Sequence, residues 1–303
     1  MPRSIHVFRT SRRAISIEAT GNVDQQFHYE MSPRQRSLRK FFRKPTNILG
    51  LGIVLAIVVV GMGAHWIAPY PADATNFARV LAAPSAQHWL GTDPLGRDVL
   101  SRIIYGTDAS LLASFGAILV AFIGGSMVGL IAGFFQGSFL DEALMRIMDA
   151  ILVLPPLVLA VALAFVLGPG IGNAMAAIAV IFSPQFARVV RSKVLTVRTL
   201  PFVESARASG AHSGRIILRH ILPSVVQPAI VLATLDLGSA IIVEASLAYL
   251  GLGLQPPDPS WGFMISSNVN YLSQAPWLIF GPSIAIALSV FGVTMIGQGL
   301  NEI

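Results

Sequence analysis

The sequence contains no cysteine, which excludes disulfides, thiol chemistry and cysteine-ligated metals. Charged residues make up only 12% of the 303 residues, about half of their share in a soluble domain, whereas 54% of the residues are hydrophobic. These values predict an integral membrane protein. The net charge of +6 would also suit a nucleic-acid-binding protein, but the placement of the charges along the chain argues against nucleic acid as a partner.

Signatures of catalysis and of nucleotide binding are missing as well. There is no GxxxxGK[ST] phosphate loop, so ATP and its Mg²⁺ would have to bind to another polypeptide. There is also no HExxH motif and no Ser/His/Asp arrangement, and the six histidines are scattered. We therefore predict that the chain is not an enzyme, has no catalytic residues, and binds no cofactor or metal by itself.

Six apolar segments have roughly the length that is needed to cross a hydrocarbon core. They lie near residues 47–67, 110–134, 147–168, 172–188, 224–246 and 277–298. This pattern predicts an all-α, polytopic membrane protein with six transmembrane helices. The fourth segment is the weakest because Ser183-Pro184 interrupts it, and Pro155-Pro156 should bend the third. Such a bend could serve as a gate or could be a packing kink.

The basic residues indicate an orientation. The polar tail at residues 1–46 holds ten of the 21 Lys and Arg residues. The segments between spans that face the same side of the membrane as the tail hold eight more, so eighteen basic residues lie on one side and three on the other. By the positive-inside rule, both termini are expected in the cytoplasm. The first thirty residues contain no apolar core, so we expect no cleavable signal peptide. Phe41 and Phe42 stand among basic residues, which indicates contact of the tail with membrane lipid.

The stretch from Glu204 to Pro223 is a charged, polar run between two apolar segments. Pro201 suits the first turn of a helix, and Glu204 would follow where a carboxylate interacts favourably with the helix dipole. Gly210 can end this helix or let another surface approach closely. Pro223 marks the entry to the next apolar helix. We therefore expect a short helix within a loop, at residues 199–223, between two spans.

This run resembles the EAA loop of bacterial ABC-importer permeases, whose pattern is Glu-Ala-Ala, three residues, Gly, nine residues and Ile-x-Leu-Pro. The matching positions are Glu204, Ala206, Gly210, Leu222 and Pro223. Ser205 replaces an alanine and His220 stands where isoleucine is commonest, and both departures resemble the dipeptide/oligopeptide branch. In that family the loop forms the coupling helix, which docks into a groove of the cytoplasmic ATPase subunit. The alternative is an ordinary basic cytoplasmic loop.

The expected outer loop at residues 68–109 contains HWLGTDPLGRD, from His88 to Asp98. This run resembles a signature of the second permease subunit of dipeptide, oligopeptide, glutathione and nickel importers. Its glycines should form turns, its aspartates can accept hydrogen bonds from backbone amides, and Arg97 could pair with Asp98. The motif could be a structural lid or could contact substrate. Its candidate residues are Gly91, Thr92, Asp93, Gly96, Arg97 and Asp98. Residues 99–105 are predicted to form a separate amphipathic helix at the outer interface.

Two further patterns concern packing and anchoring. Gly124-Gly125, Gly129 and Gly133 in the second span have the spacing that lets membrane helices pack closely. The last outer loop, residues 247–276, contains GLGLQPPDPSWG, which resembles the same permease branch. Trp261 and Trp277 in or beside this loop suit a membrane interface.

Two carboxylates lie within the fifth apolar segment. Asp236 and Glu244 are eight residues apart, so they lie within about 80° of each other around a helix. An intramembrane carboxylate is a candidate for function, here for contact with the ammonium group of a peptide or with a divalent cation along a translocation path. Alternatively, both residues bond to neighbouring helices. Asp149, at the start of the third segment, is expected to anchor a helix N-terminus.

The resemblance covers about residues 35–300 and implies a type I ABC-importer permease fold in the bacterial inner membrane. It also implies a paralogous permease subunit, two cytoplasmic ABC ATPase subunits and a periplasmic substrate-binding protein as partners. Peptides are the first expectation for the substrate, and nickel, glutathione or another small solute is the alternative within the family. Outside the family, the alternative is a secondary transporter driven by an ion gradient.

Overall fold

The computed structural model describes residues 39–302, and the regular structure of this part is helical, apart from one isolated bridge between Thr92 and Asp98. Among the described residues, five helices are long and apolar enough to cross a membrane, and the number is six if one bent pair of helices counts as a single span. This result confirms the predicted all-α membrane fold. Residues 1–38 of the predicted tail lie outside the described range. Phe41 is buried and Phe42 is half exposed, so only the second of these rings is available to lipid.

The five long helices are α2 (Pro45–Met62), α4 (Val99–Phe134), α7 (Ile171–Val197), α10 (Leu222–Tyr249) and α12 (Trp277–Asn301). The bent pair consists of α5 (Phe139–Leu152) and α6 (Pro156–Leu167), which meet at 97°. The short helices are α3 (Ala64–Ile67), α8 (Pro201–Ala208), α9 (Ser213–Ile216) and α11 (Trp261–Asn268), with 3₁₀ turns at Phe77–Arg79 and Val269–Tyr271 and a π-helical turn at Ile217–Ile221. Prolines begin α6 and α8, where a missing N–H costs nothing.

Three helix boundaries differ from the sequence prediction. Residues 99–105 are not a separate interfacial helix, because Asp98 caps one continuous 36-residue helix whose first turns are buried. Ser183-Pro184 does not interrupt α7, because a proline removes only one backbone hydrogen bond and this turn is buried among neighbouring helices. The third span begins already at Phe139 rather than near 147, because Ser138 caps it. The bend expected at Pro155-Pro156 is present.

Small residues hold α4 against α7. A Cβ atom on Gly125 would come within 2.3 Å of the Ser183 carbonyl oxygen, and a Cβ on Gly129 would come equally near to that of Ala187. Gly133 is similarly close to Val194, whereas Gly124 faces open space. The two backbones therefore touch along several turns, as the glycine spacing predicts.

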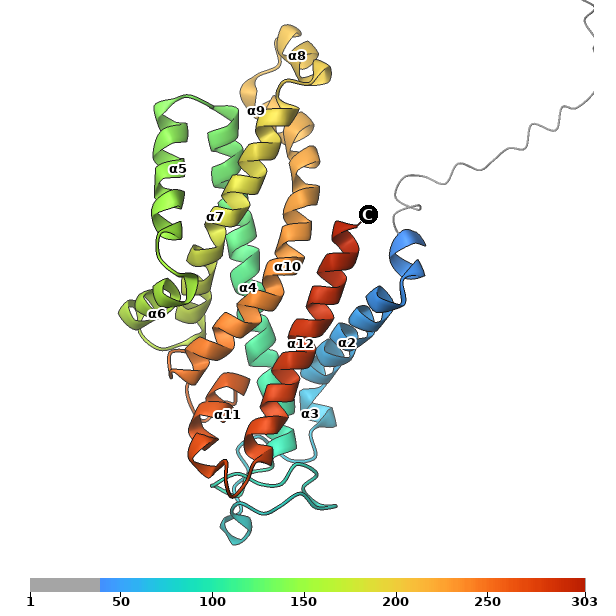
Figure 1. The fold of residues 1–303 in the computed structure, drawn as a ribbon, viewed down its shortest axis with the longest axis vertical. Helices are drawn as coiled ribbons and strands as arrows, with labels where there is room; N and C mark the ends of the chain where they lie inside the picture. The colour runs from blue at the N-terminus through green and yellow to red at the C-terminus, as the bar shows by residue number, and fades with distance from the viewer. Residues whose placement is uncertain (1–38, 303) are drawn as a thin grey trace, which may run out of the picture.

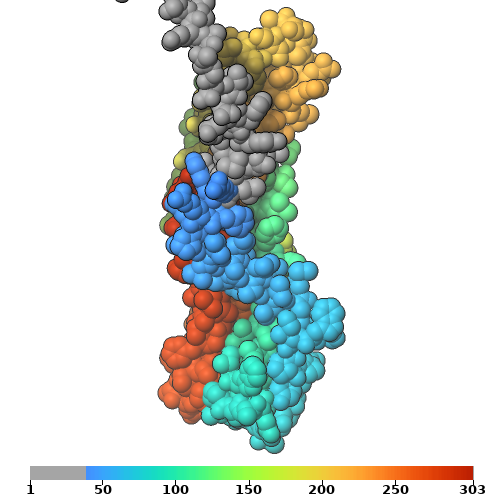
Figure 2. All heavy atoms as spheres, turned by 90° about the vertical axis from the view of Figure 1, so that its right-hand side faces the viewer, coloured from blue at the N-terminus to red at the C-terminus, as the bar shows by residue number. Residues whose placement is uncertain are grey.

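The molecule is elongated, with two structured ends. In Figure 1, α4, α7 and α10 form the centre, α2 and α12 lie on one side, and α5–α6 lie on the other. The core between α4, α6, α7 and α10 is rich in alanine. The segment with α8 and α9 lies at one end, and residues 68–98 lie at the opposite end, an arrangement that Figure 2 shows from the side.

Candidate functional site

The α8 end has the local structure that the sequence predicts. Helix α8 begins at Pro201 and carries Glu204 in its first turn. Gly210 follows the helix with φ +78°, and a Cβ atom there would meet nothing within 4 Å. The Ala211 amide bonds to the Ala206 carbonyl at 3.1 Å, which closes the turn. Gly210 therefore has the first of the two roles considered, the left-handed end of the helix, and no other part of residues 39–302 approaches it closely.

The α8–α9 segment is anchored on one side and open on the other. Val203 is fully buried and packs with Ile216 and Ile221 against Val194 and Val197 of α7. The opposite side of α8 carries Glu204 and Ser205, which are exposed, while Ala206 is half-buried. Phe202 stacks on the ring of His220 at 6.5 Å between centroids. Leu222, half-buried, and Pro223, exposed, form the first turn of α10.

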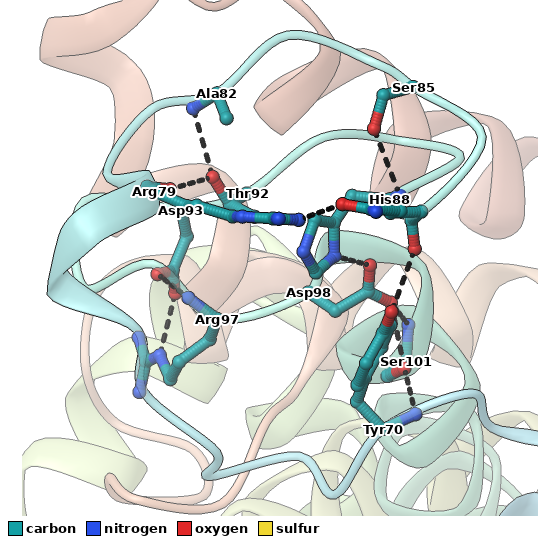
Figure 3. Close-up of polar contacts among 11 residues, drawn as sticks. Tyr70, Arg79, Ala82, Ser85, His88, Thr92, Asp93, Arg97, Asp98 and Ser101 are labelled. Atoms are coloured by element: carbon teal, nitrogen blue, oxygen red, sulfur yellow. Dashed lines mark hydrogen bonds and ion pairs between the residues drawn. The ribbon is translucent and has the colours of Figure 1, made fainter.

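The loop at the other end is held by bonds among its own residues (Figure 3). The Asp93 carboxylate accepts hydrogen bonds from the amides of Leu95 and Arg97 at 2.8 and 2.9 Å, and from Nε of Arg97 at 2.6 Å. The Asp98 carboxylate caps α4 by accepting from the Ser101 amide at 2.8 Å, and it pairs with Nδ1 of His88 at 2.8 Å. The predicted Arg97–Asp98 ion pair is therefore wrong, because Asp98 is turned toward α4 and His88.

The remaining motif residues also fix the backbone conformation of the loop. Gly91 and Gly96 both have φ +71°, and a Cβ on Gly96 would lie 1.9 Å from a carbonyl oxygen of Asn76. The Thr92 hydroxyl accepts from the Ala82 amide at 2.9 Å and donates to the Arg79 carbonyl. All six motif residues thus make contacts within the loop, as the structural interpretation requires.

Beside the motif, the same loop forms an open pocket of about 500 Å³. Its floor includes the buried His88, whose ring lies 4.9 Å from the ring of Tyr70. Its lining also includes the Arg79 guanidinium, which donates to the Gln87 side chain. Within residues 39–302 no carboxylate pairs with Arg79. The pocket is therefore lined by polar side chains, including the Asp98 carboxylate that is paired with His88 and the Arg79 guanidinium, which has no carboxylate partner among the described residues.

The two carboxylates of α10 are both inside the helix bundle. Asp236 is 9% exposed and Glu244 is 4% exposed, and each has a fully buried carboxylate oxygen without a hydrogen-bond partner among the described residues. Ala240, between them, packs in the core with α4 and α7. Contact with a solute would therefore require these helices to separate. The sequence located both residues within a span, and the structure adds that they are turned inward.

Two anchoring predictions are corrected. Trp261 is not at a membrane interface: it is 1% exposed and its Nε1 donates to the Ile103 carbonyl at 3.0 Å, because α11 folds back against α4. The exposed tryptophans are Trp66 and Trp89. Asp149 does not anchor a helix N-terminus, since it lies in the last turn of α5 and accepts a hydrogen bond from Arg188 of α7 at 2.7 Å.

Sequence reasoning also missed the residue that does begin α5. Ser138 accepts from the Asp141 amide at 3.3 Å, and the Asp141 carboxylate binds Arg191 of α7. The Ser-x-x-Asp spacing before an apolar run is a known signature of a helix start, and it would have located this boundary. The pairing with Arg191 has no such local signal.

Comparisons with known proteins agree with this architecture. Residues 125–303 match the family described as binding-protein-dependent transport system inner membrane component, and residues 32–84 match the N-terminal transmembrane domain of oligopeptide transport permease C. A dipeptide transport system permease protein DppC from Alkalihalophilus pseudofirmus is 41% identical over 272 residues, which cover 90% of this chain and 89% of the relative. A glutathione transport system permease protein GsiD from Pectobacterium atrosepticum is 38% identical over 272 residues, covering 89% and 90%.

A di/tripeptide transport system permease protein DppC from Pseudomonas aeruginosa is 38% identical over 277 residues, covering 89% of this chain and 91% of the relative. Among solved structures, a chain of the inward-facing MetNI methionine ABC transporter has a TM-score of 0.53 at 20% identity, over 66% of this chain and 93% of that chain, and supports the fold alone. The matched length and the apolar spans make this a multi-pass inner membrane protein. The chain belongs to the family of inner membrane components of binding-protein-dependent transport systems, with dipeptide and oligopeptide permeases among its relatives.

Proposed function

We propose that this chain is the permease subunit of an ATP-driven importer that carries small peptides across the bacterial inner membrane. The observation that carries the proposal is the α8–α9 segment. Its inner side is fixed to α7 through Val203, Ile216 and Ile221, while Glu204 and Ser205 remain exposed. A segment that is firmly packed on the permease and free on its other side can receive a movement from a partner and pass it to the membrane helices.

The charge distribution supports an orientation with the α8 end in the cytoplasm. Eighteen of the 21 Lys and Arg residues belong to the tail, to residues 188–219 or to position 146, and some of them lie within α5 and α7. In this orientation residues 68–98 face the periplasm, where a binding protein delivers its cargo. Arg79, which lines the pocket of this loop without a carboxylate partner among the described residues, is then available to an acidic group of a docking partner.

The proposed cycle needs further subunits. A periplasmic binding protein releases substrate at the 68–98 end, and two cytoplasmic ATPase subunits bind ATP and Mg²⁺ and close. Glu204–Pro223 transmits this closure and opens the path outward, and hydrolysis resets the inward-facing state. A paralogous permease completes the path, so that this chain contributes one side of it. In the opened state, the inward-turned Asp236 and Glu244 are candidates to meet the ammonium group of a peptide.

Peptides are preferred as substrate because relatives at 41% and 38% identity are described as dipeptide and di/tripeptide permeases. Glutathione is the second candidate, because similarly close relatives are described as glutathione permeases. Glutathione is itself a modified tripeptide, so one path of suitable width would serve either cargo.

The test is reconstitution of this chain with its permease partner, ATPases and binding protein in proteoliposomes. We expect uptake of radiolabelled dialanine that requires both ATP and the binding protein and that persists when ionophores collapse the proton and sodium gradients. Uptake by this chain alone under a proton or sodium gradient would instead establish a secondary transporter. Unlabelled glutathione as competitor distinguishes the two cargo classes.

A further inference from the structure

Helix α5 has little apolar contact with the rest of the molecule. Of its 14 residues, only Asp141 and Met148 are buried. It leads directly into the 97° bend and α6, so the two helices form one sharply bent pair. In Figure 1 it lies at the outer left edge. Packing alone therefore constrains the position of α5 weakly, and the few polar contacts that it makes carry more weight.

Two ion pairs connect α5 to α7. The Asp141 carboxylate accepts from Nε and Nη2 of Arg191, both at 2.8 Å, and its side chain is 7% exposed. A bidentate pair of this kind fixes orientation as well as distance. Deeper along the helix, Arg188 donates to Asp149 at 2.7 Å, with both side chains about half exposed. The first pair is the stronger constraint, because removal of one partner leaves a largely buried charge without compensation.

The same part of α7 supports the α8–α9 segment. Val190 and Val194, on either side of Arg191, belong to the apolar cluster that holds Val203 and Ile216. After α7 ends at Val197, the Arg198 side chain donates to the carbonyls of Gly133 and Phe134 at the end of α4. The end of α7, the end of α4 and the α8–α9 segment are therefore one packed unit, and Arg191 is the point at which α5 is attached to it.

We propose that the Asp141–Arg191 pair positions the bent pair of helices α5 and α6, so that these helices move with the α8–α9 segment. Asp141 and Arg191 are positioning residues here, because they act through the helices that they join. The proposal rests on the proposed function, in which α8–α9 receives the movement of the ATPases. Without the pair, the segment and the body of α7 would still move, while α5 and the bend would lag behind.

The first test measures transport per ATP in the reconstituted complex. In Asp141→Asn, we expect ATP hydrolysis near the wild-type rate and a fall of about fivefold in dialanine taken up per ATP. Arg191→Lys retains the charge but not the two parallel bonds, and should give an intermediate value. Exchange of the two residues, Asp141→Arg with Arg191→Asp, should recover most of the coupling. The matched control is Glu142→Gln, which removes the exposed pair with Arg146 and should change nothing.

The second test measures position directly, which also covers variants that transport poorly. Because this chain lacks cysteine, spin labels can be placed at Leu140→Cys on α5 and Ala208→Cys on α8. In the assembled complex, we expect the distance between them to stay constant between the nucleotide-free and ATP-bound states. In Asp141→Asn, it should change on ATP binding. A reference pair, Trp66→Cys with Ala208→Cys, should change on ATP binding in both backgrounds.

The outcomes separate the two proposals. If the reference distance never changes, ATP does not move the α8–α9 segment, and the proposed function fails. If it changes while Asp141→Asn keeps both the constant α5–α8 distance and normal uptake per ATP, only the positioning role is overturned. If Asp141→Asn lowers ATP hydrolysis and uptake in equal proportion, and the exchanged double variant does not recover them, the positioning role is also overturned. The pair would then contribute to folding only.

Discussion

Gly210 offers the most direct test of the α8–α9 segment. With φ +78° it occupies the left-handed region, and since no atom lies within 4 Å of a Cβ placed there, a substitution is opposed by backbone conformation alone. That conformation costs a non-glycine residue about 1–2 kcal/mol. A cost of this size shifts the balance between the closed turn and an unwound one by roughly 5- to 30-fold. We therefore expect Gly210→Val to lower dialanine uptake per ATP in proteoliposomes while the subunit remains in the membrane.

The control variants separate backbone strain from loss of a partner contact. Gly251, after α10, has φ +77° and equally free surroundings, so Gly251→Val should lower the thermal unfolding temperature similarly and leave uptake per ATP unchanged. Gly210→Asn should retain most coupling, because asparagine tolerates the left-handed region. If Gly210→Asn were as defective as Gly210→Val, or if Gly210→Val transported normally, the role assigned to this turn would be refuted.

Three further predictions concern other parts of the chain. Gly129→Ala places a Cβ 2.3 Å from a backbone oxygen of α7 and should destabilise the subunit by about 1–3 kcal/mol in thermal unfolding. The control Gly124→Ala meets nothing within 4 Å and should be neutral, so equal stability of the two variants would contradict the close helix contact. Asp98→Ala removes the cap of α4 and the partner of His88, and should lower the stability of this region by about 1–3 kcal/mol. The loss should appear as faster hydrogen exchange in residues 85–104, and unchanged exchange would be evidence against the cap. Asp236→Asn should change the concentration dependence of peptide uptake if this carboxylate meets the ammonium group in the open state, and identical kinetics would assign it to packing.

What could be predicted from the sequence depended on how far apart the interacting residues are. Helix α8 follows from Pro201, Glu204 and Gly210, which act within a few residues of one another, and both ends of this helix were anticipated. The Asp93 turn is equally local. By contrast, Asp141 and Arg191 are separated by 50 positions, and no local sequence pattern indicates that they pair.

Tertiary contacts also overruled local signals. Arg97 is adjacent to Asp98 in the sequence, which favoured an ion pair between them. In the structure the Asp98 carboxylate instead caps α4 and bonds to the buried His88. Trp261 was assigned to the interface from residue type, whereas the fold of α11 buries it beneath the start of α4. Pro184 was read as an interruption, although a helix packed on several sides tolerates the loss of one backbone bond.

The internal bonding of residues 68–98 has a consequence for the rate and strength of docking at that end. Because Asp93, Thr92 and Asp98 already fix the backbone of the loop, most of its conformational entropy is lost when the subunit folds and not when a partner arrives. A protein that binds to this surface therefore meets a preorganised shape, and little of the contact energy is consumed in ordering it. Such a surface therefore favours fast association and a higher affinity for any protein that docks there.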